Sequence, residues 1–255
     1  MSEEQEATRT AHDEPLLTAA NMLAWRHAQT NAPITRLPEA AILTHQRFLL
    51  PRRRLLWRRD PSSHAFSFDT RPLAHGAVTL AGVRGVGAPV TAIAIEELAA
   101  AGVRRLVALD IGGSIDTAVR SGEVVLIDRA IACDGTSPHY AAEPVVRPNE
   151  ALTKRLGERL TAHGIPFTTA AAWSTDAVYR ETPSQLDGAR RQGAVIADME
   201  TACVFAVTAA LGIEAAAVLV AADELHDSWR PPADMSLMQA RLRGLLEAAA
   251  ACLLP

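Results

Sequence analysis

The sequence predicts an α/β fold, a three-layer α/β/α sandwich with a mixed central β-sheet. Short apolar runs alternate along the chain with segments of helical periodicity, which favours α/β over all-helical or all-β architectures. Of the 255 residues, 49% are hydrophobic and only 4% aromatic, so the chain has ample material for a core built from aliphatic side chains. Gly102, Gly164 and Gly212 each follow a predicted helix, where a glycine typically ends the helix.

The hydrophobic pattern predicts the position of each helix and strand along the chain. Before residue 70 the pattern is less clear, and we expect a helix near residues 16–29 and a strand over 40–43. Apolar runs bounded by turn residues predict further strands over 77–83, 103–111, 124–132, 167–173, 194–197 and 215–222. Helical periodicity predicts helices over 90–100, 150–162, 185–192, 201–211 and 235–253.

Domain organisation, charge and cysteine content limit the classes of function that the chain can have. We expect a disordered acidic tail over residues 1–14 and a single domain over 15–255, because no Gly/Ser/Pro-rich linker divides the chain after Val78. The net charge of -4 argues against nucleic acid as a partner. A local basic cluster is solvated or reaches an anionic ligand; its members are Arg47, Arg52, Arg53, Arg54, Arg58 and Arg59. Three cysteines without metal-ligand spacing, and the lack of a bilayer-length apolar run, predict a cytoplasmic protein without a membrane partner or metal.

Two acidic residues stand where buried strands are predicted to end. Met199 and Glu200 lie where one apolar strand gives way to a helix, and Asp223 ends a second apolar strand. Because ligands in α/β sheets bind outside the carboxyl ends of strands, these acids are expected to face one pocket. Structural roles are the alternative: Glu200 as an acid at a helix start, and Asp223 as the cap of a turn.

These motifs carry a family resemblance. Asp198-Met199-Glu200 followed by Ala222-Asp223 resembles the Glu-Met-Glu and Ser-Asp motifs of the nucleoside phosphorylase and nucleosidase superfamily. Residues 85–89 look like that superfamily's Gly-Ile-Gly-Gly-Pro turn. Residues 133–140 resemble its Asp-Gly-Thr/Ala-Ser-x-His-Phe/Tyr segment, and residues 173–179 its Ser-(Ser/Ala)-Asp-x-Phe-Tyr segment. The resemblance covers about two thirds of the chain and implies a phosphorylase/hydrolase-like fold.

The resemblance implies roles for individual residues. Glu200 would hold the ribose hydroxyls, Met199 would line the apolar face of the sugar, and Asp223 would protonate a purine-like base as it leaves. Contacts with the substrate would also come from Gly113, Trp173, Val178, Tyr179 and His139, with His64 a further candidate. Trp173 and Tyr179 are equally compatible with packing, and Val178 stands where relatives have a base-stacking Phe. A lone histidine such as His139 is more often structural.

The phosphate site of the resembled family is incomplete in this sequence. Gly85 and Gly87 fit a turn whose amides bind an anion at a helix start, although such turns also serve packing. Phosphorolytic relatives follow the next strand with Arg-(Ile/Val)-Gly-(Thr/Ser), where this chain reads Ala108-Leu-Asp110-Ile111. Asp110 adds negative charge where a dianion would bind. Arg47 and Ser114 are the remaining candidates for holding phosphate or another acceptor.

The sequence therefore predicts an enzyme that cleaves the N-glycosidic bond of a nucleoside or nucleoside-like metabolite. The resemblance favours a phosphorylase with a purine-type leaving base, and inorganic phosphate would then be the second substrate. A hydrolytic nucleosidase that uses water is the first alternative, because the phosphate site is depleted. A nucleoside-binding protein with impaired catalysis is the second. No cofactor is implied, and the resemblance implies a homo-oligomer, either a dimer or a hexamer.

Overall fold

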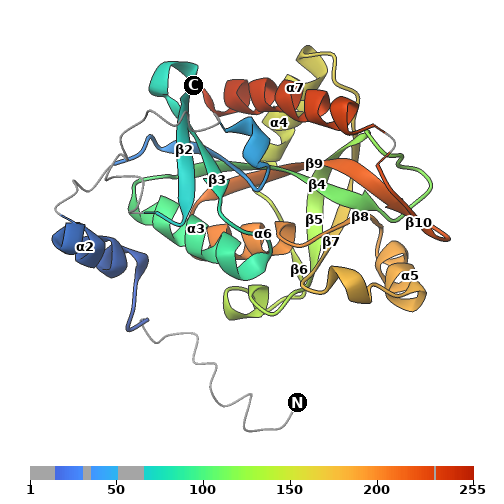
Figure 1. Cartoon of the computed structure of the whole chain (residues 1–255), viewed down its shortest axis with the longest axis horizontal. Helices are drawn as coiled ribbons and strands as arrows, with labels where there is room; N and C mark the ends of the chain where they lie inside the picture. The colour runs from blue at the N-terminus through green and yellow to red at the C-terminus, as the bar shows by residue number, and fades with distance from the viewer. Residues whose placement is uncertain (1–14, 31–35, 51–65, 233) are drawn as a thin grey trace, which may run out of the picture.

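The computed structural model describes residues 15–30, 36–50, 66–232 and 234–255 (Figure 1). Within these residues, ten strands form one sheet with the order β10-β9-β5-β7-β8-β4-β1-β3-β2, and β6 pairs with β5. The strands are β1 (Ala40–Thr44), β2 (Phe68–Leu73), β3 (Val78–Val83), β4 (Arg105–Ser114), β5 (Val124–Cys133), β6 (Val145–Val146), β7 (Thr168–Thr175), β8 (Ala194–Asp198), β9 (Glu214–Leu225) and β10 (Trp229–Arg230).

Helices cover both faces of the sheet (Figure 1). On one face, α3 and α6 contribute buried residues to an apolar cluster, and on the other α4 and α7 do the same. The α-helices are α2 (Ala19–Thr30), α3 (Ala88–Ala100), α4 (Glu150–Ala162), α5 (Pro183–Arg191), α6 (Thr201–Ala210) and α7 (Met235–Leu253). The short 3₁₀ helices are η1 (Arg47–Leu49), η3 (Ala74–Gly76), η4 (Ser137–His139) and η5 (Val178–Arg180). The predicted three-layer fold with a mixed sheet is confirmed.

The sheet curls so that five of its strands pair in a closed circuit. β4 pairs with β9, β9 with β5, β5 with β7, β7 with β8, and β8 returns to β4. The β4–β9 pair is parallel and the β4–β8 pair is antiparallel. The end of β4 is therefore held between β8 and β9, the two strands that carry the acids identified in the sequence.

Glycines let the three strand ends approach closely. Gly113 of β4 pairs with Ala197 of β8 on one side and with Asp223 of β9 on the other. A Cβ atom on Gly113 would lie 3.0 Å from an oxygen of Asp223, and one on Gly112 would lie 2.5 Å from the carbonyl oxygen of Ala197. A side chain at either position would force the strands apart, so glycine is required there.

Most predicted elements are present. The predicted helices over 150–162 and 235–253 match α4 and α7, and the predicted strands differ from those observed by no more than three residues at either end. The sequence analysis missed β2, β6 and β10. β2 is an edge strand whose pattern is obscured by Pro72 and by exposed positions that alternate with less exposed ones. β6 and β10 each contain only two residues, too few to give a pattern. The predicted acidic tail lies outside the described residues.

Candidate active site

Two acids, Asp198 and Glu200, lie at the junction between β8 and α6 and make different contacts. Asp198 caps α6, accepting hydrogen bonds at one oxygen from the amide (2.8 Å) and hydroxyl (2.5 Å) of Thr201. Its other oxygen accepts from the hydroxyl of Ser174 at 2.5 Å. Glu200 occupies the N-cap position, but its side chain makes no capping hydrogen bond. Asp198, and not Glu200, therefore makes the side-chain capping hydrogen bonds of α6.

Glu200 points instead to the start of α3. Its carboxylate accepts a hydrogen bond of 2.6 Å from the amide of Gly87, the N-cap residue of α3, where φ is 98°. Its second oxygen accepts from the amide of Met199 at 3.2 Å. Burial raises the pKa of Glu200 to about 7, and the nearby Asp198 adds to the shift. The Glu200 carboxylate is therefore hydrogen-bonded to one of the amides that the sequence predicted to bind an anion.

A buried hydrogen-bond network lies beside Glu200, where β1 ends next to the middle of β4. His45 Nδ1 lies 2.6 Å from Asp110 Oδ2, and His45 Nε2 lies 3.0 Å from the hydroxyl of Thr91 on α3. Gln46 Nε2 donates to the other oxygen of Asp110 at 2.7 Å. The backbone amide of His45 also donates to Asp110, at 2.7 Å. Asp110 is therefore paired and held, rather than left as an isolated negative charge.

Asp223, the second candidate acid, lies on β9 near the β9–β10 hairpin. It is partly buried, and its Oδ2 accepts a hydrogen bond of 2.6 Å from the indole Nε1 of Trp229. Trp229 is itself 63% exposed. The carboxyl group of Asp223 is thus oriented by a side chain from β10 and borders Gly113 of β4.

A second carboxyl group accompanies Asp223. Glu181 follows η5, and burial together with the charge of Asp223 raises its pKa to about 7. Its Oε2 is buried and makes no hydrogen bond to any described residue. Burial and the neighbouring charge of Asp223 thus favour the protonated form of Glu181 near neutral pH.

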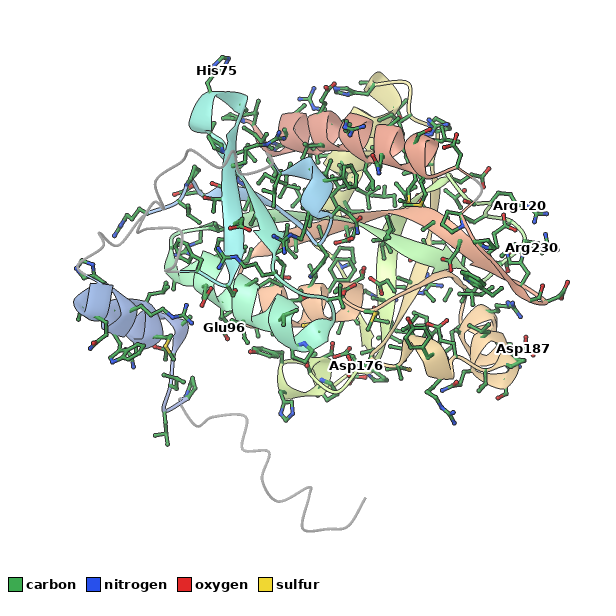
Figure 2. All side chains as sticks on the ribbon, in the orientation of Figure 1. His75, Glu96, Arg120, Asp176, Asp187 and Arg230 are labelled. Atoms are coloured by element: carbon green, nitrogen blue, oxygen red, sulfur yellow. The ribbon has the colours of Figure 1, made fainter. Side chains whose placement is uncertain are left out.

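Charged side chains brace the turn that follows Asp223. Glu224 lies 3.5 Å from Arg120 and 3.8 Å from Arg230, and its carboxylate accepts from the amide of Ser121 at 3.1 Å. Figure 2 shows Arg120 and Arg230 close together at the end of the molecule where β10 lies. These contacts hold the end of β9 directly beside Asp223.

The other residues predicted to contact the substrate differ in their solvent exposure. Trp173 is 4% exposed and packs in a core cluster with Leu186 of α5, so it fills the interior and is not available to stack on a base. Val178 and Tyr179 are 47% and 97% exposed. His139 is exposed in η4. The structure does not gather these side chains around Asp223 as it gathers Glu181 and Trp229.

The residues predicted to hold phosphate have different surroundings. Gly87 is engaged by Glu200, while Gly85 lies in the same turn with φ of 150°. The buried hydroxyl of Ser114 donates to the loop after β4, 2.7 Å from the carbonyl oxygen of Val119. Arg47 is exposed and makes no ion pair with any residue that the structure describes. His64 and the other arginines of the basic cluster lie outside the described residues.

Sequence reasoning missed three residues of the site: His45, Glu181 and Trp229. Their partners are Asp110, Thr91 and Asp223, which lie between 6 and 65 residues away along the chain. The sequence holds one weak signal for His45, a polar residue directly after an apolar strand. Nothing local marked the other two.

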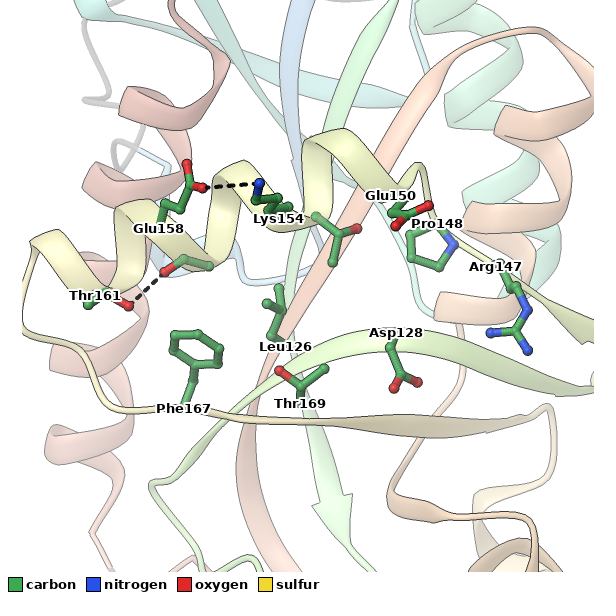
Figure 3. Close-up of a pocket in the computed structure, with 12 residues that line it drawn as sticks. Leu126, Asp128, Arg147, Pro148, Glu150, Lys154, Glu158, Thr161, Phe167 and Thr169 are labelled. Atoms are coloured by element: carbon green, nitrogen blue, oxygen red, sulfur yellow. Dashed lines mark hydrogen bonds and ion pairs between the residues drawn. The ribbon is translucent and has the colours of Figure 1, made fainter.

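A separate hollow opens on the α4 side of the sheet, with a volume of about 580 Å³ (Figure 3). Its floor is apolar, formed in part by Leu126 and Phe167, and Lys154 and Glu158 pair along α4 on one side of it at 4.0 Å. Neither Glu200 nor Asp223 lines it. Among the described residues, no group of three or more His, Cys, Asp or Glu side chains can hold a metal ion, and no helix is long and apolar enough to cross a bilayer.

Comparisons with known proteins identify the family of the chain. The model of the phosphorylase superfamily matches residues 47–254, which is well over half of the chain. The chain belongs to the phosphorylase superfamily. Among curated members, a guanosine phosphorylase from Halorubrum lacusprofundi is 29% identical over 136 residues, which cover 52% of this chain and 56% of that protein. The chain spans about half the length of the curated relatives it matches.

Solved structures of this superfamily show the same fold over more of the chain. A uridine phosphorylase from Vibrio fischeri aligns with a TM-score of 0.70 at 19% identity, covering 87% of this chain and 94% of that one. An AMP nucleosidase from Bacteroides thetaiotaomicron aligns with a TM-score of 0.67 at 18% identity, covering 92% and 97%. Superfamily members named for phosphorolysis and one named as a nucleosidase thus share this architecture.

Proposed function

We propose that this member of the superfamily hydrolyses the N-glycosidic bond of a nucleoside, with a purine-type base as the leaving group. Glu200 would bind the ribose hydroxyls, Met199 would contact the sugar, and Asp223 would protonate the departing base. An oxocarbenium-like transition state is stabilised by a nearby carboxylate and by hydroxyl contacts that strengthen as positive charge develops. The presence of both acids argues against a protein that only binds nucleosides.

One observation carries the choice of water over phosphate. Where phosphorolytic relatives are expected to place an arginine and a hydroxyl, this chain has Ala108 and Ile111, and between them Asp110 is held by His45 and Gln46. The negative charge of Asp110 disfavours a dianion at this position. Two missing charge-assisted contacts, each contributing about 1.5 to 3 kcal/mol, weaken phosphate binding by about two to four orders of magnitude.

The purine assignment has support of a different kind. Asp223 borders Gly113 at the open end of the site, and Glu181 beside it has a pKa of about 7, so a proton is available there at neutral pH. A general acid of this type suits a base that leaves with a proton on a ring nitrogen. The names of relatives include both guanosine and uridine phosphorylases, so the choice of base remains a proposal.

A nucleoside panel tests this function. Purine and pyrimidine nucleosides are incubated with the protein, with and without phosphate, and free base is measured by chromatography. We expect base release from purine nucleosides at a rate that added phosphate does not change. Release that requires phosphate would favour the phosphorylase, and tight binding without release over hours would favour a binding protein.

A further inference from the structure

The carboxylate of Asp110 is surrounded by hydrogen-bond donors. Oδ2 accepts from the backbone amide of His45 at 2.7 Å and lies 2.6 Å from His45 Nδ1. Oδ1 accepts from Gln46 Nε2 at 2.7 Å and from the amide of Ile111 at 3.1 Å. A carboxylate offers about four acceptor positions, so these four donors, the Asp110 cage, use its whole capacity.

One donor of the Asp110 cage carries a positive charge. The hydroxyl of Thr91 donates to the carbonyl oxygen of Gly87 at 2.9 Å, so its oxygen accepts from His45 Nε2, which lies 3.0 Å away. Nδ1 donates to Asp110, and both ring nitrogens therefore carry hydrogen. Burial lowers the pKa of His45, but the hydrogen bond and charge of Asp110 and two further acids raise it, and the net shift is upward. The ring is an imidazolium whose counter-ion is Asp110.

The donors of the Asp110 cage are held in place by contacts other than those with Asp110. The imidazolium is fixed at Nε2 by Thr91, and the amide of Gln46 donates to the hydroxyl of Thr44 at 3.1 Å. β1 runs parallel to β4, and this pairing sets the residues that follow Thr44 beside Asp110. A cation, a carboxamide and backbone amides that converge in this way form a binding site for an oxyanion.

The Asp110 cage lies next to the carboxylate that would hold the ribose. Burial is the main cause of the raised pKa of Glu200, but the charge of Asp110 raises it further and the charge of His45 lowers it. Gly87 also joins the two, because its carbonyl oxygen accepts from Thr91 and its amide donates to Glu200. The side chain of Asp110 is 10% exposed, so the cage borders solvent. An anion in the cage would therefore lie beside the sugar.

We propose that the Asp110 carboxylate is a built-in anion that fills this oxyanion site and thereby restricts the acceptor of the sugar to water. The second part of this proposal rests on the proposed hydrolysis. With Asp110 in place, an external phosphate finds the donors of the cage already used and a negative charge in their midst. A neutral water molecule meets no such repulsion. Without the carboxylate, the imidazolium of His45 would be left buried and unpaired, and an external anion would be favoured in the cage.

Anion complementation of Asp110→Ala tests the built-in anion. The variant should melt below the parent, and formate, a carboxylate without a side chain, should bind in the space that is left. We expect about 0.5 M sodium formate to raise its Tm by about 2 to 5 °C relative to the same concentration of sodium chloride. Inorganic phosphate should also raise the Tm of Asp110→Ala. Neither anion should stabilise the parent beyond the effect of chloride.

The products of Asp110→Ala test the restriction to water. The variant and the parent are incubated with a purine nucleoside and phosphate. Ribose 1-phosphate should appear among the products of Asp110→Ala and not among those of the parent. Formate should suppress ribose 1-phosphate, because it competes with phosphate for the same donors.

Two further variants serve as controls. Asp187→Ala removes an exposed carboxylate, labelled in Figure 2, and should respond to formate no more than to chloride. Asp110→Asn removes the charge but keeps the side chain in the cage, so it should be destabilised and gain nothing from formate or phosphate. If Asp110→Ala folds only with an added anion, its refolding yield in formate and in chloride replaces the Tm, and a higher yield in formate is expected.

The possible failures are distinguishable. Equal effects of formate, phosphate and chloride on Asp110→Ala, or a specific formate effect on Asp110→Asn, would overturn the built-in anion. Anion binding by Asp110→Ala without any ribose 1-phosphate would overturn the restriction of the acceptor by Asp110. Base release by the parent only in the presence of phosphate would instead overturn the proposed hydrolysis.

Discussion

The two ends of the candidate site are built differently. At the end formed by β1, β4 and the start of α3, the side chains of Glu200, His45 and Asp110 are largely buried; His45 bonds Asp110, and Glu200 accepts from the amide of Gly87. At the other end, Asp223 has one hydrogen bond, from a tryptophan that is 63% exposed, and Glu181 has an unpaired oxygen. One end is pre-organised and closed, and the other is open.

This difference indicates where the chemistry is set and where it can vary. Pre-organised dipoles and charges in a dry site stabilise developing charge without rearrangement, which suits the sugar and its nucleophile. An exposed hairpin tolerates different bases with little cost to the fold. Both ends nevertheless hold a carboxyl group with a pKa of about 7, Glu200 through burial and Asp198, and Glu181 through burial and Asp223.

The largest effect is expected at the open end. Asp223→Asn keeps the shape of the side chain but removes the transferable proton, so release of purines that leave poorly should slow by about two to four orders of magnitude. Substrates with activated leaving groups should lose less. Asp227→Asn, four residues further along and exposed, is the matched control. Equal slowing of both kinds of substrate would show that Asp223 is not the general acid.

At the closed end, Glu200→Gln should lower turnover by about two to three orders of magnitude, because it removes a charged contact that strengthens in the transition state. Steady-state kinetics measure the loss, and thermal unfolding monitors the fold. A variant that melts early but keeps the parent's turnover per folded molecule would show that Glu200 is structural.

Glu200→Gln should also change the stability of the protein, in a way that depends on pH. The pKa of Glu200 is raised from 4.5 to about 7, so between these values the native state binds more protons than the unfolded state, and stability falls as the pH rises. Removing the charge should therefore make Glu200→Gln more stable than the parent at pH 8, by about 1 to 3 kcal/mol. The difference should disappear near pH 4.5. Urea unfolding at the two pH values checks this, and a variant less stable at pH 8 would contradict it.

Asp198 lies two residues from Glu200, but its substitution should lower the stability of the protein. Asp198→Ala leaves the hydroxyl of Ser174 and the amide and hydroxyl of Thr201 without their acceptor. The free energy of unfolding should fall by about 2 to 4 kcal/mol. Urea unfolding measures the loss. Unchanged stability would mean that the start of α6 does not depend on this cap.

The smallest effect is expected at Trp229. Trp229→Phe removes the indole donor to Asp223 and keeps an aromatic ring in β10. Loss of one exposed hydrogen bond corresponds to about 0.5 to 1.5 kcal/mol, so turnover should fall by no more than about tenfold. Thermal unfolding should be unchanged. A loss as large as that of Asp223→Asn would mean that the open end is as closely specified as the closed end.

The sequence predicted the fold because the fold depends on local signals, and local signals also marked both acids as candidates. Apolar strands, helical periodicity and terminal glycines identify the layers, and a carboxylate at a strand end stands out against its apolar neighbours. His45 could not be identified in this way, since its role depends on Asp110, 65 residues away, and on the register of β1 beside β4. Trp173 was a candidate for stacking, and only its packing against α5 shows it to be core.

The central claim is that water, not phosphate, accepts the sugar. Phosphorus-31 NMR of a complete reaction with a purine nucleoside and excess phosphate tests it directly. The account predicts free ribose as the sugar product, no ribose 1-phosphate signal, and a rate independent of phosphate concentration. Ribose 1-phosphate formed in proportion to the base released, with the rate saturating at millimolar phosphate or below, would contradict the account.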